Sequence, residues 1–255
     1  MYAEERHEAI ATLVRQRGRV SVTDLAQTFE VTSETVRRDL DSLERAGLLR
    51  RVHGGAVPVA ALTRRERTLR ERDGVRVEQK DRIAQAAIGL LPEAGGSVIL
   101  DAGTTTARAA MRFPVDSRLT VLTNSLTCAS TLTSLGGIQL EMLGGRVRET
   151  TQACVGDRTV REIDTLRADV AFLGANGFSL DGGLTTPDAE EAAVKRALVT
   201  AAHRVVLLAD SSKFGRDYLV RFAHLTDIDV LVTDDEIDRE QLGQLTAAGV
   251  EVLLG

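Results

Sequence analysis

The sequence predicts an α/β protein with a small helical N-terminal domain and a larger, mainly parallel α/β domain. Three observations predict this architecture. With 255 residues, the chain can bury one sizeable core and still form a small second domain. Three short helical patterns and a glycine-tipped hairpin fill the first part of the chain, and strand and helix patterns alternate from residue 80 onward. We therefore expect domains at residues 1–58 and 80–255, joined by a linker at residues 59–79.

Composition is that of an ordinary globular protein, which we expect in the cytoplasm and away from membranes. Hydrophobic residues make up 43% and charged residues 27% of the chain. No run of about eighteen apolar residues could span a bilayer, and the opening letters MYAEERHEAI lack the apolar core of a signal peptide. Cys128 and Cys154 have neither CxxC spacing nor a nearby histidine, so we expect reduced residues in or near the core. Neither a metal site nor a cofactor is expected.

The net charge of -5 hides an asymmetry along the chain. Residues 1–82 hold 17 Lys and Arg against 14 Asp and Glu, a net of +3, whereas the remainder has a net of -8. A mildly basic N-terminal part is only weak evidence for nucleic-acid binding, because the placement of the positive charges matters more than the net charge.

Three helices are expected in the N-terminal domain, and a short turn of helix-turn-helix length separates the last two. Ser21 or Thr23 is a candidate N-cap for the second helix. Thr32 or Ser33 is a candidate N-cap for the third helix, and Gly47 should end it. The three helices share apolar residues at helical spacing and are expected at residues 5–16, 20–29 and 34–47.

The exposed face of the third helix begins with hydroxyls and two arginines. At about 100° per residue, Arg38 lies roughly opposite the apolar stripe of Val36, and Thr35 and Arg37 flank that stripe. The N-terminal part of such a helix enters the major groove of DNA, where arginine bridges guanine O6 and N7. The alternative is a solvated face on which Arg37 and Arg38 pair with Asp41 and neighbouring acids.

A hairpin follows this helix and completes a winged helix. The letters LLRRVHGGAV predict a strand, a Gly54-Gly55 tip and a returning strand. Arg51 and His53 would stand beside the DNA backbone and add phosphate contacts. A lone histidine is more often a structural hydrogen-bonding group, so that interpretation of His53 stays open.

The linker is dense in arginine and glutamate and poor in large apolar residues. Its letters ALTRRERTLRERDGVRVEQK favour an exposed, partly helical connector, with weak DNA affinity as the alternative.

Strands and helices alternate in the C-terminal domain, which implies a mainly parallel sheet covered on both faces. Strands, one of them with its following loop, are expected at residues 95–103, 119–125, 138–145, 169–177, 204–215, 227–235 and 250–254. Helices are expected at residues 81–92, 104–113, 126–135, 157–166, 188–202 and 238–249.

Five polar motifs follow strands of this sheet, at the edge where open parallel sheets bind ligands. Each motif alone is equally consistent with a turn that caps the next helix, but together they converge on one edge. The threonines at residues 104–106 can cap a helix and present its amides to a phosphate, and Lys195 or Lys213 can supply positive charge. Carboxylate and amide groups of the motifs can orient sugar hydroxyls. The candidate ligand residues are Asp101, Gly103, Thr104, Thr105, Thr106, Asn124, Ser125, Gly145, Asn176, Lys195 and Lys213.

Taken together, these motifs resemble the DeoR family of transcription regulators. SETVRRDL and RVHGGA carry the resemblance in the N-terminal part, and LDAGTTT, VLTNS, LGGRV, DVAFLGANGF, EEAAVKRA and LLADSSKFG carry it over residues 80–235. The resemblance implies that Ser33, Thr35, Arg37 and Arg38 bind double-stranded operator DNA, with the wing in support. It also implies a sensor domain that is similar in fold to pentose-phosphate isomerases and binds a phosphorylated sugar.

A protein of this family would act as a homo-oligomer, a dimer or a tetramer, and as a repressor of a sugar uptake or catabolism operon. The chain resembles most the fructose-operon branch, so a fructose phosphate is the expected effector. The sequence leaves the particular sugar, the operator, the sign of regulation and the oligomeric state open.

A sugar-phosphate isomerase of the same fold is the alternative, and it needs a carboxylate near the abstracted proton. Such isomerases carry an Asp-Gly-Ala-Asp run where this chain has Gly-Ala-Asn-Gly at residues 174–177. Glu190, Glu191 and Lys195 remain on the following helix. We therefore expect a binding switch and no enzyme. A constitutive architectural DNA-binding protein, the third possibility, leaves the edge motifs unexplained.

Overall fold

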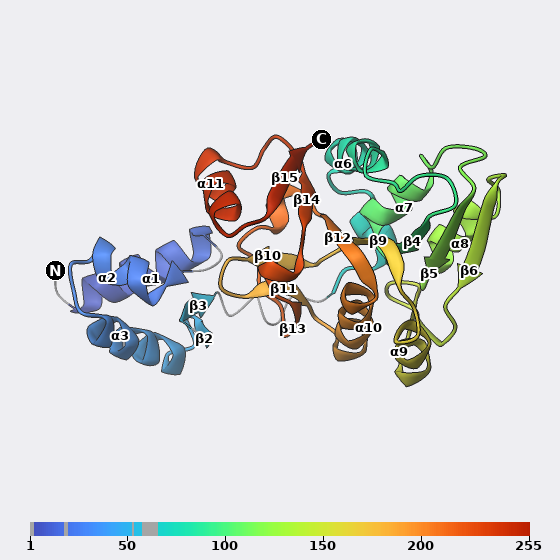
Figure 1. Cartoon of the computed structure of the whole chain (residues 1–255). Helices are drawn as coiled ribbons and strands as arrows, with labels where there is room; N and C mark the ends of the chain where they lie inside the picture. Colours follow the sequence, from blue (N-terminus) through green and yellow to red (C-terminus); the bar gives the residue numbers. More distant parts are fainter. Residues whose placement is uncertain (1–2, 18–19, 53, 58–65) are drawn as a thin grey trace.

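The computed structural model describes residues 3–17, 20–52, 54–57 and 66–255 of the chain. Figure 1 shows helices and a small hairpin in the N-terminal part, in blue, and a large sheet with helices in the remainder, coloured from teal to red. The architecture is the predicted one, a winged helix-turn-helix followed by a mainly parallel α/β domain. His53, a predicted DNA-binding residue, lies outside the described residues.

Side chains cap the second and third N-terminal helices. The Ser21 hydroxyl accepts the amide of Asp24, and the Thr32 hydroxyl accepts the amide of Thr35. The chain leaves the third helix through Gly47, whose φ of 70° favours glycine. The first strand has only two residues, too few for a sequence pattern to predict it. The elements are α1 (Ala3–Arg17), β1 (Val20–Ser21), α2 (Val22–Thr28), α3 (Ser33–Arg45), β2 (Arg50–Val52) and β3 (Gly55–Val57), with strand order β1-β3-β2.

A buried ionic contact fixes α3 against α1. Asp39 is 5% exposed, and its carboxylate accepts two hydrogen bonds from Arg6, at 2.6 and 3.0 Å. His7 Nε2 lies 2.8 Å from the same carboxylate. Burial raises the pKa of Asp39, but the hydrogen bonds from Arg6 and His7 outweigh burial and hold the pKa below its usual value. The contact holds α3 in one orientation beside α1.

The large sheet of the C-terminal domain has seven parallel strands in the order β15-β14-β12-β9-β4-β5-β6. This confirms the predicted parallel sheet. Its strands are β4 (Ser97–Leu100), β5 (Leu119–Thr123), β6 (Ile138–Met142), β9 (Ala168–Leu173), β12 (Ala202–Leu208), β14 (Val230–Thr233) and β15 (Glu251–Leu254).

Helices cover both faces of the sheet. Successive residues of each strand point to opposite sides, so each strand contributes side chains to two apolar cores. In β4, Val98 and Leu100 belong to one apolar core and Ile99 belongs to the other. No helix in the described part of the chain is long and apolar enough to cross a membrane. The first face packs against α6 (Val77–Ile88), α7 (Thr104–Ala110) and α8 (Leu126–Leu132), and the second against α9 (Asp157–Ile163), α10 (Ala189–Thr200) and α11 (Arg239–Ala247).

Two short antiparallel sheets add to the predicted strands. β7 (Arg146–Arg148) pairs with β8 (Ala153–Val155), and β11 (Gly183–Thr186) lies between β10 (Gly177–Ser179) and β13 (Val220–Ala223). Strands of three or four residues give an alternation too short to predict from sequence. Two 3₁₀ turns lie at Ser211–Lys213 and Leu225–Asp227.

The second half of the predicted linker is partly helical, as predicted, and only partly exposed. Residues 66–76, which we call the connector, contain helix α5 (Leu69–Asp73) and pack against the α/β domain. The amide of Leu69 donates to the carbonyl of Thr150 at 2.8 Å. Glu66 and Arg76 form ion pairs with the domain, whereas Arg67, Arg70 and Glu71 are exposed, so the predicted exposure holds for part of this segment. The domain boundaries themselves stay a prediction.

Both cysteines are buried and unpaired, as predicted. Burial raises the pKa of the Cys128 thiol to about 12. This thiol therefore stays protonated at neutral pH and acts as a small apolar group of the core.

Candidate DNA-binding surface and ligand cavity

Helix α3 presents two arginines to solvent. The side chain of Arg37 is 57% exposed and that of Arg38 is 78% exposed, and they reach Glu34 at 3.7 and 3.4 Å. An ion pair between exposed side chains contributes only about 0–1 kcal/mol, so Glu34 leaves both arginines available to DNA. Thr35 is half-buried, and its hydroxyl lies 2.9 Å from that of Thr32 within the helix cap.

A groove beside α3 brings together three of the predicted DNA-binding residues. Ser33, Arg37 and Arg51 line it, together with the glycine pair of the wing. Arg51 forms an ion pair with Asp41, and its amide donates to the Glu44 carboxylate at 3.0 Å. A phosphate contact by Arg51 would therefore exchange one acidic partner for another.

A cavity of about 470 Å³ lies beyond the carboxyl ends of β4, β9 and β12. These strands are neighbours in the sheet, so the polar residues that follow them converge there. The predicted ligand residues that line the cavity are Gly103, Thr104, Thr105, Thr106, Asn176, Lys195 and Lys213.

Three predicted ligand residues, Asn124, Ser125 and Gly145, do not line this cavity. They follow β5 and β6, which lie further along the sheet from β9 and β12. The Asn124 amide donates to the carbonyl of Cys154 at 3.3 Å, and Ser125 caps α8. A Cβ on Gly145 would collide with the hydroxyl of Thr159, so this glycine permits close packing. All three therefore make local structural contacts outside this cavity, and their role in ligand binding stays a prediction.

Asp101, the remaining predicted ligand residue, lies beneath the cavity wall and does not line it. It is 1% exposed, and its carboxylate binds the Lys195 ammonium and accepts the amide of Gly174 at 3.0 Å. Lys195 also donates to the carbonyl of Gly174 at 2.9 Å. Asp101 therefore positions Lys195, which itself reaches the cavity.

The threonines at the start of α7 do not cap that helix, contrary to the expectation. Within the described residues, no side chain caps α7, and the Thr106 hydroxyl instead donates to the carbonyl of Gly103 at 3.0 Å. Thr105 is 3% exposed, and its hydroxyl has no hydrogen-bond partner among the described residues. Because an unpaired buried hydroxyl is unfavourable, this group is available to a ligand in the cavity.

Sequence reasoning missed the cations that the connector brings to this cavity. An arginine-rich segment is typical of a solvated surface, so the arginines of the connector were not predicted to line the cavity. Cations outnumber acids in the lining, so the cavity is a local basic site within an acidic domain. The cations are Arg67, Arg72, Arg76, Lys80, Lys195, Lys213 and Arg216, and the acids are Glu66, Glu191 and Asp210.

Two lysines of the cavity have lowered pKa values. Lys80 is 3% exposed and donates to the carbonyl of Arg72, and burial lowers its pKa. Burial lowers the pKa of Lys213 to about 8, and the charges of Arg72, Lys80 and Lys195 act in the same direction, although Asp210 opposes them. A bound anion would relieve this mutual repulsion among the cations.

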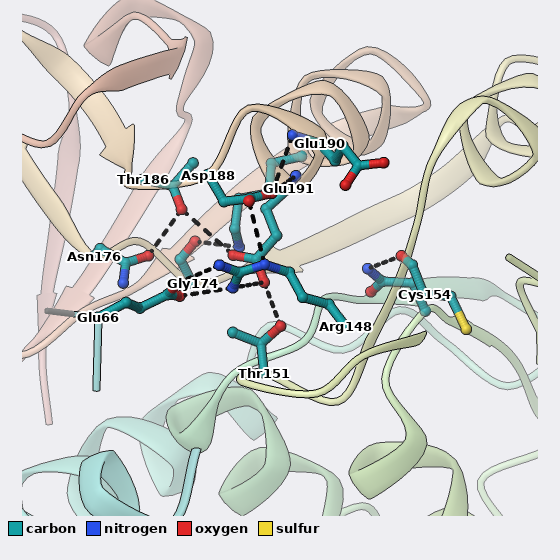
Figure 2. A network of polar contacts seen from close by, with 12 residues as sticks. Glu66, Arg148, Thr151, Cys154, Gly174, Asn176, Thr186, Asp188, Glu190 and Glu191 are labelled. Atoms are coloured by element: carbon teal, nitrogen blue, oxygen red, sulfur yellow. Dashed lines mark hydrogen bonds and ion pairs between the residues drawn. The ribbon is translucent and has the colours of Figure 1, made fainter. Parts of the chain in front are cut away.

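Arg148 links the connector to the cavity wall, as Figure 2 shows. Its guanidinium binds Glu66 of the connector at 2.9 Å, Asp188 at 3.3 Å and Glu191 at 3.2 Å. The hydrogen bond that Arg148 donates to the Glu66 carboxylate contributes most to raising the pKa of Arg148 above its usual value. Thr151 donates to Glu191 as well. The carboxylate of Glu191 therefore has several partners within the wall.

Comparisons with known proteins match both parts of the chain. The model of a DeoR-like helix-turn-helix domain matches residues 6–60, and that of a DeoR C terminal sensor domain matches residues 75–235. The chain is 38% identical to the HTH-type transcriptional regulator GlpR of Haloferax volcanii, over 100% of this chain and 99% of that protein. It is 33% identical to the glycerol-3-phosphate regulon repressor of Escherichia coli strain K12, over 92% of each. Ribose 5-phosphate isomerase A from Methanocaldococcus jannaschii is a similar solved structure, with 18% identity, 54% of each chain covered and a TM-score of 0.39.

Proposed function

This chain belongs to the DeoR family of transcription regulators, and from that premise we propose that it is a repressor released from operator DNA by a phosphorylated sugar or polyol. The resemblance to the fructose-operon branch favours a fructose phosphate. The name of one relative adds glycerol 3-phosphate as a second candidate.

The basic cavity is the observation that carries this proposal. Its lining combines seven cations with buried hydroxyls and the amide of Asn176, at the edge where a parallel sheet binds ligands. A phosphate dianion suits the cations, and sugar hydroxyls suit the amide and carboxylate groups. The assigned ligand residues are Gly103, Thr104, Thr105, Thr106, Asn176, Lys195 and Lys213.

The exposed face of α3 supports the DNA-binding half of the proposal. We assign base and phosphate contacts to Arg37 and Arg38, with Ser33, Thr35 and Arg51 beside them. A homo-oligomer would hold two such helices over operator half-sites, and the effector would change their spacing. Coupling between two sites of this kind is typically about 1–3 kcal/mol, or roughly 5- to 150-fold in affinity.

A gel-shift titration tests the proposal. The probe is the DNA upstream of the chain's own coding region, and the panel is fructose 1-phosphate, fructose 6-phosphate, glucose 6-phosphate and glycerol 3-phosphate, with fructose and glycerol as uncharged controls. We expect a specific complex that at least one phosphorylated compound dissociates and the uncharged controls do not. A wild-type complex that no member of the panel changes would contradict the proposal.

Lys213→Ala should keep DNA binding and lose the effector response. The Lys213 ammonium lines the cavity and donates to the carbonyl of Ala175 at 2.7 Å, so its removal takes away a cation without touching the winged helix. A charge-assisted contact contributes about 1.5–3 kcal/mol, so the effector concentration for half-release should rise roughly ten- to hundredfold. Arg204→Ala, at an exposed arginine of β12, is the control. Unchanged release in Lys213→Ala would show that Lys213 is not a ligand residue.

Effector affinity should also fall as the pH rises through about 8, the pKa of Lys213. Protonated Lys213 attracts the phosphate, and the second pKa of a phosphate ester is near 6, so the phosphate keeps its charge while Lys213 loses its proton in this range. Affinity at pH 9 should be roughly tenfold weaker than at pH 7, which calorimetry can measure. Lys213→Arg should flatten this dependence, because arginine stays charged. An equally steep dependence in that variant would assign the titration to another group.

An isomerase is the alternative function, and of the two glutamates that remain on α10, Glu191 is the better candidate for its base. Glu191 lines the cavity, whereas Glu190 pairs with Arg146 outside it. Arg148 and Thr151 already bind the Glu191 carboxylate, which disfavours proton abstraction. We expect no isomerisation of ribose 5-phosphate or fructose 6-phosphate by the purified protein. Turnover that disappears in Glu191→Gln would overturn the choice of a regulator.

A further inference from the structure

The guanidinium of Arg72 is buried without hydrogen-bond partners at two of its nitrogens. Its Nε and Nη2 atoms have none among the described residues, although Arg72 lines the cavity. A buried polar group of a cation is unfavourable when nothing replaces its lost hydration. Such a group in the wall of a basic cavity indicates a ligand that supplies hydrogen-bond acceptors.

The backbone around Arg72 is fixed from both ends of the connector. At one end, Glu66 binds Arg148, and at the other, Arg76 binds the fully buried Asp234 at 3.0 Å. The ammonium of Lys80 binds the carbonyl of Arg72 itself. Arg72 is therefore a positioned side chain with unused donors.

The neighbouring helix α7 supplies a second unused donor. Helix α5 of the connector contacts helix α7, where the buried Thr105 hydroxyl lacks a partner among the described residues. Lys80 and Lys213 add positive charge to the same cavity. A guanidinium fork and a hydroxyl beside ammonium groups match the several acceptor oxygens of a phosphate dianion.

We propose that Arg72 binds the phosphate group of the effector together with Thr105, so that the ligand ties the connector to α7. The inference rests on the proposed function and adds the regulation of that same site. The chain passes from the wing, which ends at Val57, to the connector, which begins at residue 66. A ligand that holds the connector therefore acts on the segment that leads to the DNA-binding domain.

Variants of two arginines in α5 test the assignment. Arg72→Gln removes the guanidinium, Arg72→Lys keeps the charge without the fork, and Arg70→Gln removes an exposed arginine of the same helix as the control. Calorimetry of the full chain with inorganic phosphate and with the four phosphorylated compounds measures affinity. We expect a loss of roughly ten- to hundredfold in Arg72→Gln, a smaller loss in Arg72→Lys and a change below about twofold in Arg70→Gln.

Thermal unfolding without ligand separates a ligand residue from a structural one. Because Nε and Nη2 of Arg72 bind no described residue, Arg72→Gln should unfold at or above the wild-type temperature. A clear fall in the unfolding temperature would overturn the assignment. Hydrogen exchange gives a direct readout of the connector: inorganic phosphate should protect residues 66–76 in the wild type and in Arg70→Gln, but not in Arg72→Gln.

The outcomes distinguish this inference from the proposed function. If a sugar phosphate releases DNA from the wild type and from Arg72→Gln at the same concentration, the inference fails and the function stands. If inorganic phosphate binds through Arg72 but no sugar phosphate releases DNA, the function fails and the phosphate site stands. Wild-type protein that binds no phosphate at all would overturn both.

Discussion

Arg38→Ala should reduce operator binding to the level of non-specific DNA. Arg38 is more exposed than Arg37, and its ion pair in the described residues is with Glu34, at 3.4 Å. A bidentate contact to guanine contributes about 1–3 kcal/mol, and a dimer on two half-sites would lose two of them. The expected loss is therefore about 2–6 kcal/mol, measured by gel shift or fluorescence anisotropy at fixed salt concentration.

A matched control lies on the same helix. Arg45 is exposed at the C-terminal end of α3, where its guanidinium binds the carbonyl of Asp41 at 3.3 Å. The N-terminal part of a recognition helix contacts the bases, so Arg45→Ala should change specific binding much less. Retained specific binding in Arg38→Ala would refute the role given to that arginine. An equal loss in both variants would point to general charge instead of base recognition.

Asp101→Ala should destabilise the α/β domain by about 3–5 kcal/mol, because it leaves the buried ammonium of Lys195 without its carboxylate partner. For a domain of this size, such a loss lowers the unfolding temperature by roughly 6–20 °C. Circular dichroism of the full chain during heating measures it. A loss of stability without ligand is expected if Asp101 positions Lys195, and it is not expected if Asp101 only contacts the ligand.

Two further variants make this test specific. Asp101→Ala combined with Lys195→Met removes both charges and should recover much of the lost stability, since no buried ion is left unpaired. Asp235→Ala breaks an ion pair with Arg82 in which both side chains are largely exposed, so it should cost no more than about 1 kcal/mol. Stability of Asp101→Ala equal to the wild type would contradict the pairing.

Much of the fold follows from local patterns. The cap of α2 by Ser21, the cap of α3 by Thr32 and the departure through Gly47 each involve residues that are close in sequence. The strands of the parallel sheet are apolar runs such as the one at Val98–Leu100, since both of their faces are covered. The short strands β1, β7 and β10 were missed because two or three residues carry no period.

The ligand cavity was predictable only in part. Thr105 and Lys213 were predicted because polar residues at the carboxyl ends of parallel strands are a general signal, whereas Lys195, on α10, was predicted as a cation for the phosphate. Asn124 carries the same signal but follows β5, which is not among the three strands beneath the cavity. Arg72 carries no such signal, since it lies in a segment whose composition is typical of an exposed linker.

The sequence by itself determined the order and type of the long elements, the helix caps and the presence of a DNA-binding helix ahead of a sensor domain, because these depend on neighbouring residues and on motifs. Only the tertiary structure decided which strand ends are adjacent and that residues of the connector line the cavity beside them. Strand order and ion pairs such as Glu66 with Arg148 join residues far apart along the chain. No local pattern encodes such contacts, since they form only when the domain packs.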